Sequence, residues 1–189
     1  MIVIENAINP HLLRAAWATW PDKKWRGWHR YSGRDAEKYG TKSHHDITTA
    51  ANACLMQMIT AASEYVIDEA FPDLELHGAG MHMIPPSGYL AKHLDSSVMV
   101  STGWRREYSC VLGVNPEWDA GWGGEFVMNG EIVQPKFNQL ILFETTDDSF
   151  HEVQKVRGPV TRCTLAVFFW SHGTVGLNPR TQAKFFHDE

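Results

Sequence analysis

Two histidines and one aspartate in this sequence have the types and spacing to bind a metal ion. His93 and Asp95 lie two residues apart at the end of the strand-like run GYLAKHLD, and side chains two apart on a strand project from the same face. His151 follows the turn-like sequence TTDDS and directly precedes the strand-like run EVQKV, which makes it the best candidate for a second histidine ligand. Two histidines and one carboxylate on one side of iron(II) leave its other coordination positions open. An isolated His-x-Asp pair is more often a surface or capping pair, so this ligand set needs further support.

Arg162 supplies that support, because it opens the apolar run RCTLAVFFW eleven residues after His151. Period-two alternation predicts that one face of this strand carries Arg162, Thr164, Ala166, Phe168 and Trp170. A guanidinium buried there needs an anionic partner, since leaving it unpaired would be costly. A bound dicarboxylate could accept two parallel hydrogen bonds from the arginine fork. The alternative is an arginine at the strand start that pairs with a surface acid.

The elements that must position these residues begin with two helices. Asn9-Pro10 predicts a capped helix over residues 10–20, ended by Pro21, and Asp46 or Thr48 could cap a second helix through about Ala70, closed by Phe71-Pro72. Between them, residues 22–46 carry many charges, three glycines and no sustained period, which predicts a long surface loop.

After residue 75 the pattern changes to short strand-like runs separated by Gly, Pro, Asn and Asp. The predicted strands are residues 78–84, 88–95, 107–115, 123–129, 131–135, 139–144, 151–156 and 162–170. Short strands at this spacing indicate a mainly β fold with N-terminal helices (α+β) whose core is a cupin-like jelly roll or double-stranded β-helix. We therefore expect one domain over residues 1–189, with helical support in 1–75, the β-core in 76–175 and a C-terminal tail in 176–189.

Composition limits the partners. The chain has 189 residues and a formal net charge of −5, which argues against a general basic footprint for nucleic acid. Its three cysteines are odd in number and form no Cys-x-x-Cys pair, which is typical of free thiols in a reducing compartment. The N-terminus has no signal-like apolar stretch and no long apolar run occurs, so we expect a cytoplasmic protein with no membrane partner.

From about Gly80 to Trp170 the chain resembles the catalytic core of the prolyl 4-hydroxylase-like branch of the iron(II)/2-oxoglutarate-dependent oxygenases. The resemblance is carried, in order, by GYLAKHLD, RREYSCVLGVNPEWDAGWGGEF, VQPKFNQLILFETTDDSFHEV and RCTLAVFFW. It implies a dioxygenase that uses dioxygen and 2-oxoglutarate as co-substrates and ascorbate as reductant. By this resemblance His93, Asp95 and His151 would be the iron(II) ligands. Arg162 would bind the distal carboxylate of 2-oxoglutarate, assisted by Thr164.

The resemblance also implies a substrate, a prolyl residue in a peptide or protein. Tyr89, Arg106 and Phe168 fall where the branch places side chains that contact substrate. One departure is Gly113, which stands where hypoxia-sensing enzymes of the branch carry a tyrosine that helps to bind 2-oxoglutarate. Carboxylate binding would therefore depend more heavily on Arg162.

Other functions remain open at this point. The same chemistry could act on a free amino acid or another small molecule. A non-oxygenase metal-binding protein of the cupin type would share the His-x-Asp and the distal histidine, but it would have no reason to keep Arg162 on the inner wall. Residues 25–46, with their glycines, aromatic rings and basic side chains, suit a mobile flap that closes over substrate; an inert insertion is the alternative.

Overall fold

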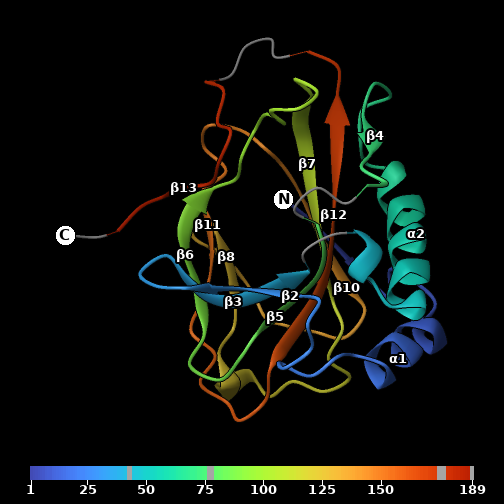
Figure 1. Cartoon of the computed structure of the whole chain (residues 1–189), viewed down its shortest axis with the longest axis vertical. Coiled ribbons are helices and arrows are strands. Elements are labelled where there is room, and N and C mark those ends of the chain that lie inside the picture. Colours follow the sequence, from blue (N-terminus) through green and yellow to red (C-terminus); the bar gives the residue numbers. More distant parts are fainter. Residues whose placement is uncertain (42–43, 76–78, 174–177, 188–189) are drawn as a thin grey trace.

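The computed structural model describes residues 1–41, 44–75, 79–173 and 178–187 (Figure 1). Within these ranges the chain forms helices α1 (Pro10–Ala18) and α2 (Thr49–Ser63) and short 3-10 turns η1 (His44–Asp46) and η2 (Ala120–Trp122). The strands are β1 (Ile2–Glu5), β2 (Trp28–Ser32), β3 (Ala36–Thr41), β4 (Phe71–Pro72), β5 (Gly80–Ile84), β6 (Tyr89–Leu94), β7 (Arg105–Gly113), β8 (Phe126–Met128), β9 (Glu131–Val133), β10 (Gln139–Glu144), β11 (His151–Val153), β12 (Arg162–Ser171) and β13 (Lys184–Phe185).

The strands form one antiparallel path in the order β1-β10-β7-β12-β5-β3-β6-β11-β8-β9. This path curls, so that the first five strands lie opposite β6, β11, β8 and β9, and β3 bridges the two halves (Figure 1). All eight strands expected after residue 75 are present. The predicted fold class, mainly β with N-terminal helices and a double-stranded β-helix core, is confirmed.

Both helices begin where the sequence predicts, because their caps satisfy the first free N–H groups. The Asn9 side chain accepts hydrogen bonds from the N–H groups of His11 and Leu12, and the Thr48 side chain accepts one from Ala51. Both helices end earlier than expected, at Ala18 and Ser63. The predicted helix through about Ala70 was wrong over its last turns, because the chain leaves the helix so that β4 can pair with β12.

The helices pack on the sheet that carries β12, with α2 against β5, β7 and β12 (Figure 1). Their apolar faces join the buried side chains of these strands in the larger core cluster, which includes Leu55, Met58, Leu112 and Leu165. A smaller cluster around Phe126, Phe143 and Val153 fills the other side of the barrel. No helix in the described part of the chain is long and apolar enough to span a membrane.

The prediction of a surface loop over residues 22–46 was wrong. Residues 28–41 form the β2–β3 hairpin, and β3 pairs with both β5 and β6; residues 42 and 43 lie outside the described residues. The composition misled because β3 faces an open pocket rather than the packed core, so its inward side chains include Lys38. Tertiary pairing overrode weak local propensity.

The segment expected as a C-terminal tail also contains a strand. β13 pairs with β6, with Phe185 opposite His93, while residues 176, 177, 188 and 189 lie outside the described range. At the other end of the chain β1 pairs with β10 as the edge strand. Two short strands that periodicity could not indicate therefore complete the sheet near the two termini of the chain.

Candidate functional site

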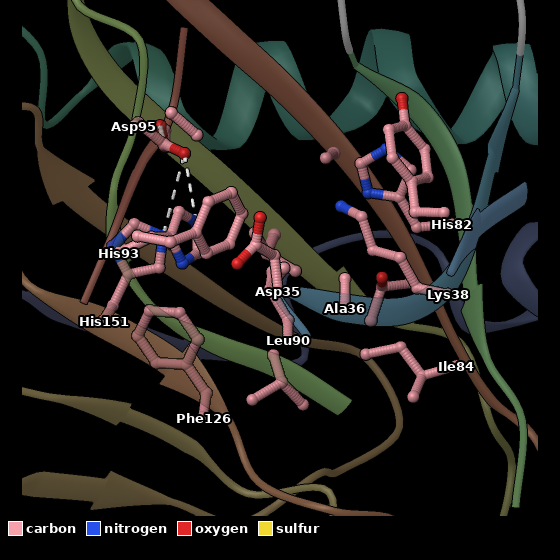
Figure 2. Close-up of a pocket in the computed structure, with 18 of the residues that line it drawn as sticks. Asp35, Ala36, Lys38, His82, Ile84, Leu90, His93, Asp95, Phe126 and His151 are labelled. Atoms are coloured by element: carbon pink, nitrogen blue, oxygen red, sulfur yellow. Dashed lines mark hydrogen bonds and ion pairs between the residues drawn. The ribbon is translucent and has the colours of Figure 1, made fainter. Parts of the chain in front are cut away.

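A cavity of about 620 Å³ opens between the two halves of the curled sheet. It is lined by the β2–β3 hairpin, by strands β5, β6, β7, β11 and β12, and by the C-terminal segment that carries Phe185. Figure 2 shows His93, Asp95 and His151 close together on one side of this pocket and Lys38 beside His82 on the other. The pocket therefore has two chemically different ends.

Strand pairing brings the two histidines together. His93, near the end of β6, is the direct cross-strand partner of His151 at the start of β11, and their ring centroids lie 4.2 Å apart. Asp95 follows β6, and its Oδ1 lies 3.5 Å from His93 Nε2 and 3.8 Å from His151 Nε2. One ligand atom from each of the three residues lies within 4.8 Å of the others.

The second nitrogen of each histidine is fixed by the backbone. His93 Nδ1 lies 2.9 Å from the carbonyl oxygen of Ala91, and His151 Nδ1 lies 2.9 Å from that of Ser149. A carbonyl can only accept, so each Nδ1 carries the proton and each Nε2 presents its lone pair to the shared centre. Burial lowers the pKa of His151 to about 4, so its ring is neutral near pH 7.

Asp95 is held in a corresponding way. Its Oδ2 accepts a hydrogen bond from Ser109 Oγ at 2.9 Å and lies 3.3 Å from Arg106 Nη1. Burial alone would raise the pKa of Asp95, but Arg106 and the two histidines hold it well below the usual range. The carboxylate is therefore ionised, with Oδ2 engaged by the protein and Oδ1 facing the histidines.

These features fit a divalent metal ion such as iron(II). Two neutral imidazoles and one carboxylate are the donor set of a facial triad, and each donor has an outer-shell partner that orients it. Three rings surround the histidines and exclude water: Phe143 packs 4.7 Å and Phe126 5.5 Å from His151, and Phe185 stacks 5.2 Å from His93. His93, Asp95 and His151 would hold the metal.

Arg162 lies at the start of β12 and lines the same cavity. Its side chain is buried, its Nε has no hydrogen-bond partner, and no carboxylate among the described residues forms an ion pair with it. Burial lowers its pKa to about 10, which leaves it charged near neutral pH. An unpaired buried guanidinium that faces a cavity suits an anionic ligand.

The surroundings of Arg162 depend on glycine at two positions. Gly124 has a φ of +75°, and a Cβ there would lie 3.1 Å from Arg162 Cδ. Gly113 pairs with Thr164 across β7 and β12, and a Cβ on it would lie 2.2 Å from the carbonyl oxygen of Lys136. The second contact explains why no side chain, tyrosine included, fits at residue 113.

The alternation predicted along β12 agrees with the lining of the cavity. Arg162, Thr164, Ala166 and Phe168 line it. Trp170 does not line the cavity, but the Arg106 guanidinium that covers Phe168 also lies 5.1 Å from the Trp170 ring centroid.

The three residues expected to contact substrate have different surroundings. Phe168 lines the cavity, but the Arg106 guanidinium lies 3.7 Å from its ring centroid and covers one face. Arg106 is occupied by Asp95 and by Ser96, to whose Oγ it donates at 2.9 Å. Tyr89 does not line the cavity; its hydroxyl donates to the carbonyl oxygens of Gly33 and Arg34 at the hairpin tip, at 2.9 and 3.3 Å.

Four residues of the site were missed in the sequence. Ser109 and Phe185 contact the metal ligands as described above, and Lys38 lines the cavity from β3. Arg180 Nε donates to the backbone oxygen of Asp95 and its Nη2 to that of Thr146, both at 3.0 Å, so it ties together the loops that carry Asp95 and precede His151. Only long-range contacts reveal these roles.

Residues 79–170, just under half of the chain, match the family model described as the 2OG-Fe(II) oxygenase superfamily. This matched segment carries His93, Asp95, His151 and Arg162. A curated relative, the prolyl 3-hydroxylase OGFOD1 of Xenopus laevis, is 30% identical over 79 residues. That match covers 36% of this chain and only 15% of the relative.

Among solved structures the similarity is to prolyl hydroxylases. A prolyl-4-hydroxylase of Pseudomonas putida superposes with a TM-score of 0.62 at 19% identity, covering 91% of this chain and 92% of that one. A Trichoplax adhaerens prolyl hydroxylase, in complex with a hypoxia inducible factor peptide fragment, gives 0.62 at 14% identity, with 90% and 83% covered. A viral collagen prolyl hydroxylase of Paramecium Bursaria Chlorella virus-1, in its 2OG complex, gives 0.57 at 13%, with 90% and 95% covered. At these identities the likeness establishes a shared fold.

Proposed function

We propose that this protein is an iron(II)- and 2-oxoglutarate-dependent dioxygenase that hydroxylates a prolyl residue in a peptide or protein. One observation carries the oxygenase assignment. The triad of His93, Asp95 and His151, in which both histidines are buried, shares a single cavity with the unpaired guanidinium of Arg162. A cupin-type metal protein without a co-substrate would have no use for that buried cation.

The metal and 2-oxoglutarate would supply the redox chemistry that dioxygen activation requires. The chain's own residues supply position and a dry environment. The backbone carbonyls of Ala91 and Ser149 keep both Nε2 atoms directed at the centre, while Ser109 and Arg106 fix the Asp95 carboxylate. Phe126, Phe143 and Phe185 exclude water around the histidines.

Arg162 would hold the distal carboxylate of 2-oxoglutarate. The arginine fork offers two parallel N–H groups, and Thr164, two residues along the same face of β12, places a hydroxyl nearby. The packing of Lys136 against Gly113 leaves no room for a side chain at residue 113 of β7. The protein's hold on this carboxylate therefore rests on Arg162.

The prolyl substrate is supported by the three structural neighbours described above and by the curated relative, each of which is a prolyl hydroxylase. The cavity is large enough for a ring substrate beside the co-substrate, and Phe168 adds an apolar wall. A free amino acid or another small molecule remains the second candidate, because about 620 Å³ also suits a small ligand. We further propose ascorbate as reductant and, from three unpaired cysteines, a cytoplasmic location.

The test is turnover with defined substrates. The protein is incubated with iron(II), ascorbate, 2-oxoglutarate and either proline-rich peptides or free proline. The reaction predicts one succinate for each substrate that gains one oxygen atom, with the second oxygen of dioxygen in succinate. Succinate formed without any hydroxylated proline would keep the oxygenase and reject the prolyl substrate. No succinate under any of these conditions would reject both.

A further inference from the structure

Lys38 places a second positive charge in the pocket. It lies on β3, lines the cavity, and its side chain extends into the pocket beside His82 (Figure 2). Its strand bridges the two halves of the sheet, with Ala36 and Glu37 paired to β6 and Tyr39 and Gly40 to β5. The ammonium is therefore carried by a well-anchored element.

No carboxylate neutralises this ammonium within ion-pair distance in the described parts of the chain. The Nζ atom of Lys38 lies 5.2 Å from the ring centroid of Tyr31, its cross-strand partner on β2. Burial lowers the pKa of Lys38; Asp95 opposes this effect and Arg162 adds to it. The neighbouring acids Glu37 and Asp35 are bound elsewhere, to Arg30 and His187.

Lys38 and Arg162 approach the cavity from strands that are not neighbours. β5 lies between β12 and β3, so their backbones are about 10 Å apart. Lys38 leans towards Tyr31 on β2, which lies on the side of β3 away from β12. When Arg162 holds the distal carboxylate of 2-oxoglutarate, Lys38 is therefore available to bind a second anion.

The surroundings of Lys38 suit a carboxylate. His82 lies beside it, directly opposite Thr164 on β12 and Gly40 on β3. Gly40 leaves this space open, because a Cβ there would lie 3.1 Å from the His82 ring. His29 and Tyr31, whose rings meet edge to face at 4.5 Å, form the outer wall. A partly desolvated ammonium in such a setting forms strong charge-assisted hydrogen bonds.

We propose that Lys38, with His82 and Tyr31 around it, binds a carboxylate of the primary substrate, so that this enzyme selects acidic substrates. The inference rests on the proposed function and deepens it. The carboxylate has two possible sources: an acidic side chain next to the target proline in a peptide, or the free α-carboxylate of proline itself. Both present the same chemistry to Lys38.

The experiment compares two pairs of probes that differ only in one carboxylate. The first pair is a proline-containing peptide with Glu beside the proline and its Gln counterpart, and the second is L-proline and L-prolinamide. Dissociation constants are measured by calorimetry on the protein loaded with iron(II) and 2-oxoglutarate, without dioxygen. The variant is Lys38→Met, which keeps the aliphatic stem; Lys38→Arg keeps the charge, and exposed Lys23→Met is the matched control.

In one of the two probe pairs, we expect the unmodified protein to bind the probe with the carboxylate about tenfold more tightly than the neutral probe. Lys38→Met should abolish that preference, Lys38→Arg should retain part of it, and Lys23→Met should keep all of it. The pair that shows this pattern identifies the source of the carboxylate. Removal of a partly buried charge should leave the melting temperature equal or higher, so a folding defect is not expected.

Two results would overturn the proposal. One is equal binding within both pairs, or a preference that survives in Lys38→Met. The other is a loss of 2-oxoglutarate affinity in Lys38→Met with the substrate preference intact, which would make Lys38 a co-substrate anchor. Mass spectrometry after admission of dioxygen tests the proposed function separately from the carboxylate site. A Lys38-dependent preference without hydroxyproline would support the carboxylate site and reject the prolyl reaction. Hydroxyproline formed without any binding preference would support the prolyl reaction and reject the carboxylate site.

Discussion

The two ends of the pocket treat buried charge in opposite ways. At the metal end, Asp95 is neutralised by Arg106 and accepts a hydrogen bond from Ser109, so its charge is satisfied within the protein. At the other end, Arg162 and Lys38 face the same cavity without a carboxylate partner in the described residues. A satisfied charge fixes geometry, whereas an unsatisfied one carries a desolvation cost that a ligand can repay.

This contrast separates two arginines that the sequence analysis expected to contact ligands. Arg106 and Arg162 are both buried, and both line the cavity. Arg106 nevertheless lies flat on Phe168 and is bound to a proposed metal ligand, so it acts as a positioning residue. We therefore propose the ligand-binding role for Arg162. Removing each residue should therefore give opposite signs in stability and different losses in function.

The largest effect is expected from the metal ligands themselves. His151→Ala or His93→Ala should abolish succinate formation, because two donors cannot replace a facial triad. Both variants should remain folded, since the histidines lie at strand ends rather than in the main core cluster. Calorimetric titration with iron(II) in the absence of dioxygen should show the loss of binding. His11→Ala, at an exposed position of α1, is the control, and full activity in either ligand variant would exclude this ligand set.

Replacing Arg106 tests the metal end of the pocket, where the buried charge is paired within the protein. Arg106→Met leaves the half-buried Asp95 carboxylate with Ser109 and the two histidines but without its guanidinium partner, and breaking a largely buried pair in this way costs about 3–5 kcal/mol of unfolding free energy. Iron affinity should also fall by about 10–100-fold, as is usual when an outer-shell partner is lost. Urea unfolding and iron titration measure the two effects. Arg30→Met, which removes an exposed pair with Glu37, should change stability by less than about 1 kcal/mol.

Replacing Arg162 tests the other end of the pocket, where the buried charge has no carboxylate partner among the described residues. Arg162→Ala should raise the 2-oxoglutarate concentration for half-maximal succinate formation by at least about tenfold, and Arg162→Lys should rescue it only partly because lysine lacks the planar fork. In contrast to Arg106, the isosteric Arg162→Met should keep or raise the melting temperature, since it removes an unpaired buried charge. Parental 2-oxoglutarate affinity in both Ala and Lys variants would place the carboxylate anchor elsewhere.

How far the sequence could predict the structure depends on whether a feature is set by neighbouring or by distant residues. The β-core follows from alternation and turn residues, and β6, β10 and β12 lie within a residue or two of the predicted bounds. Helix starts follow from Asn9 and Thr48. These features depend on neighbours in sequence, which is why composition and period reveal them.

The remaining features depend on pairing between distant segments. The register that sets His151 opposite His93 joins residues 58 positions apart in the chain, and no local pattern encodes it. The β2–β3 hairpin was missed because its inner face meets an open cavity rather than the packed core, so Lys38 stands where an apolar residue would have shown the alternation. Arg180 and Phe185 reach the site from a segment expected to be a tail.

The smallest effect concerns the hairpin that carries Lys38, and it refines the flap hypothesis for residues 25–46. β3 is bonded to β5 and β6, so any movement should be confined to β2 and to the tip at residues 33–35, which Tyr89 holds through two backbone carbonyls. Tyr89→Phe removes those bonds at about 1 kcal/mol, which should speed amide exchange at the tip by roughly fivefold and leave iron affinity unchanged. Hydrogen exchange with mass detection measures this, with exposed Tyr65→Phe as control.

Saturating substrate should slow exchange in β2 and the hairpin tip of the unmodified protein, while the β3 amides bonded to β5 and β6 stay slow throughout. If substrate leaves residues 28–35 unchanged, the hairpin is a fixed wall of the pocket, and Lys38 selects its anion without any closing movement.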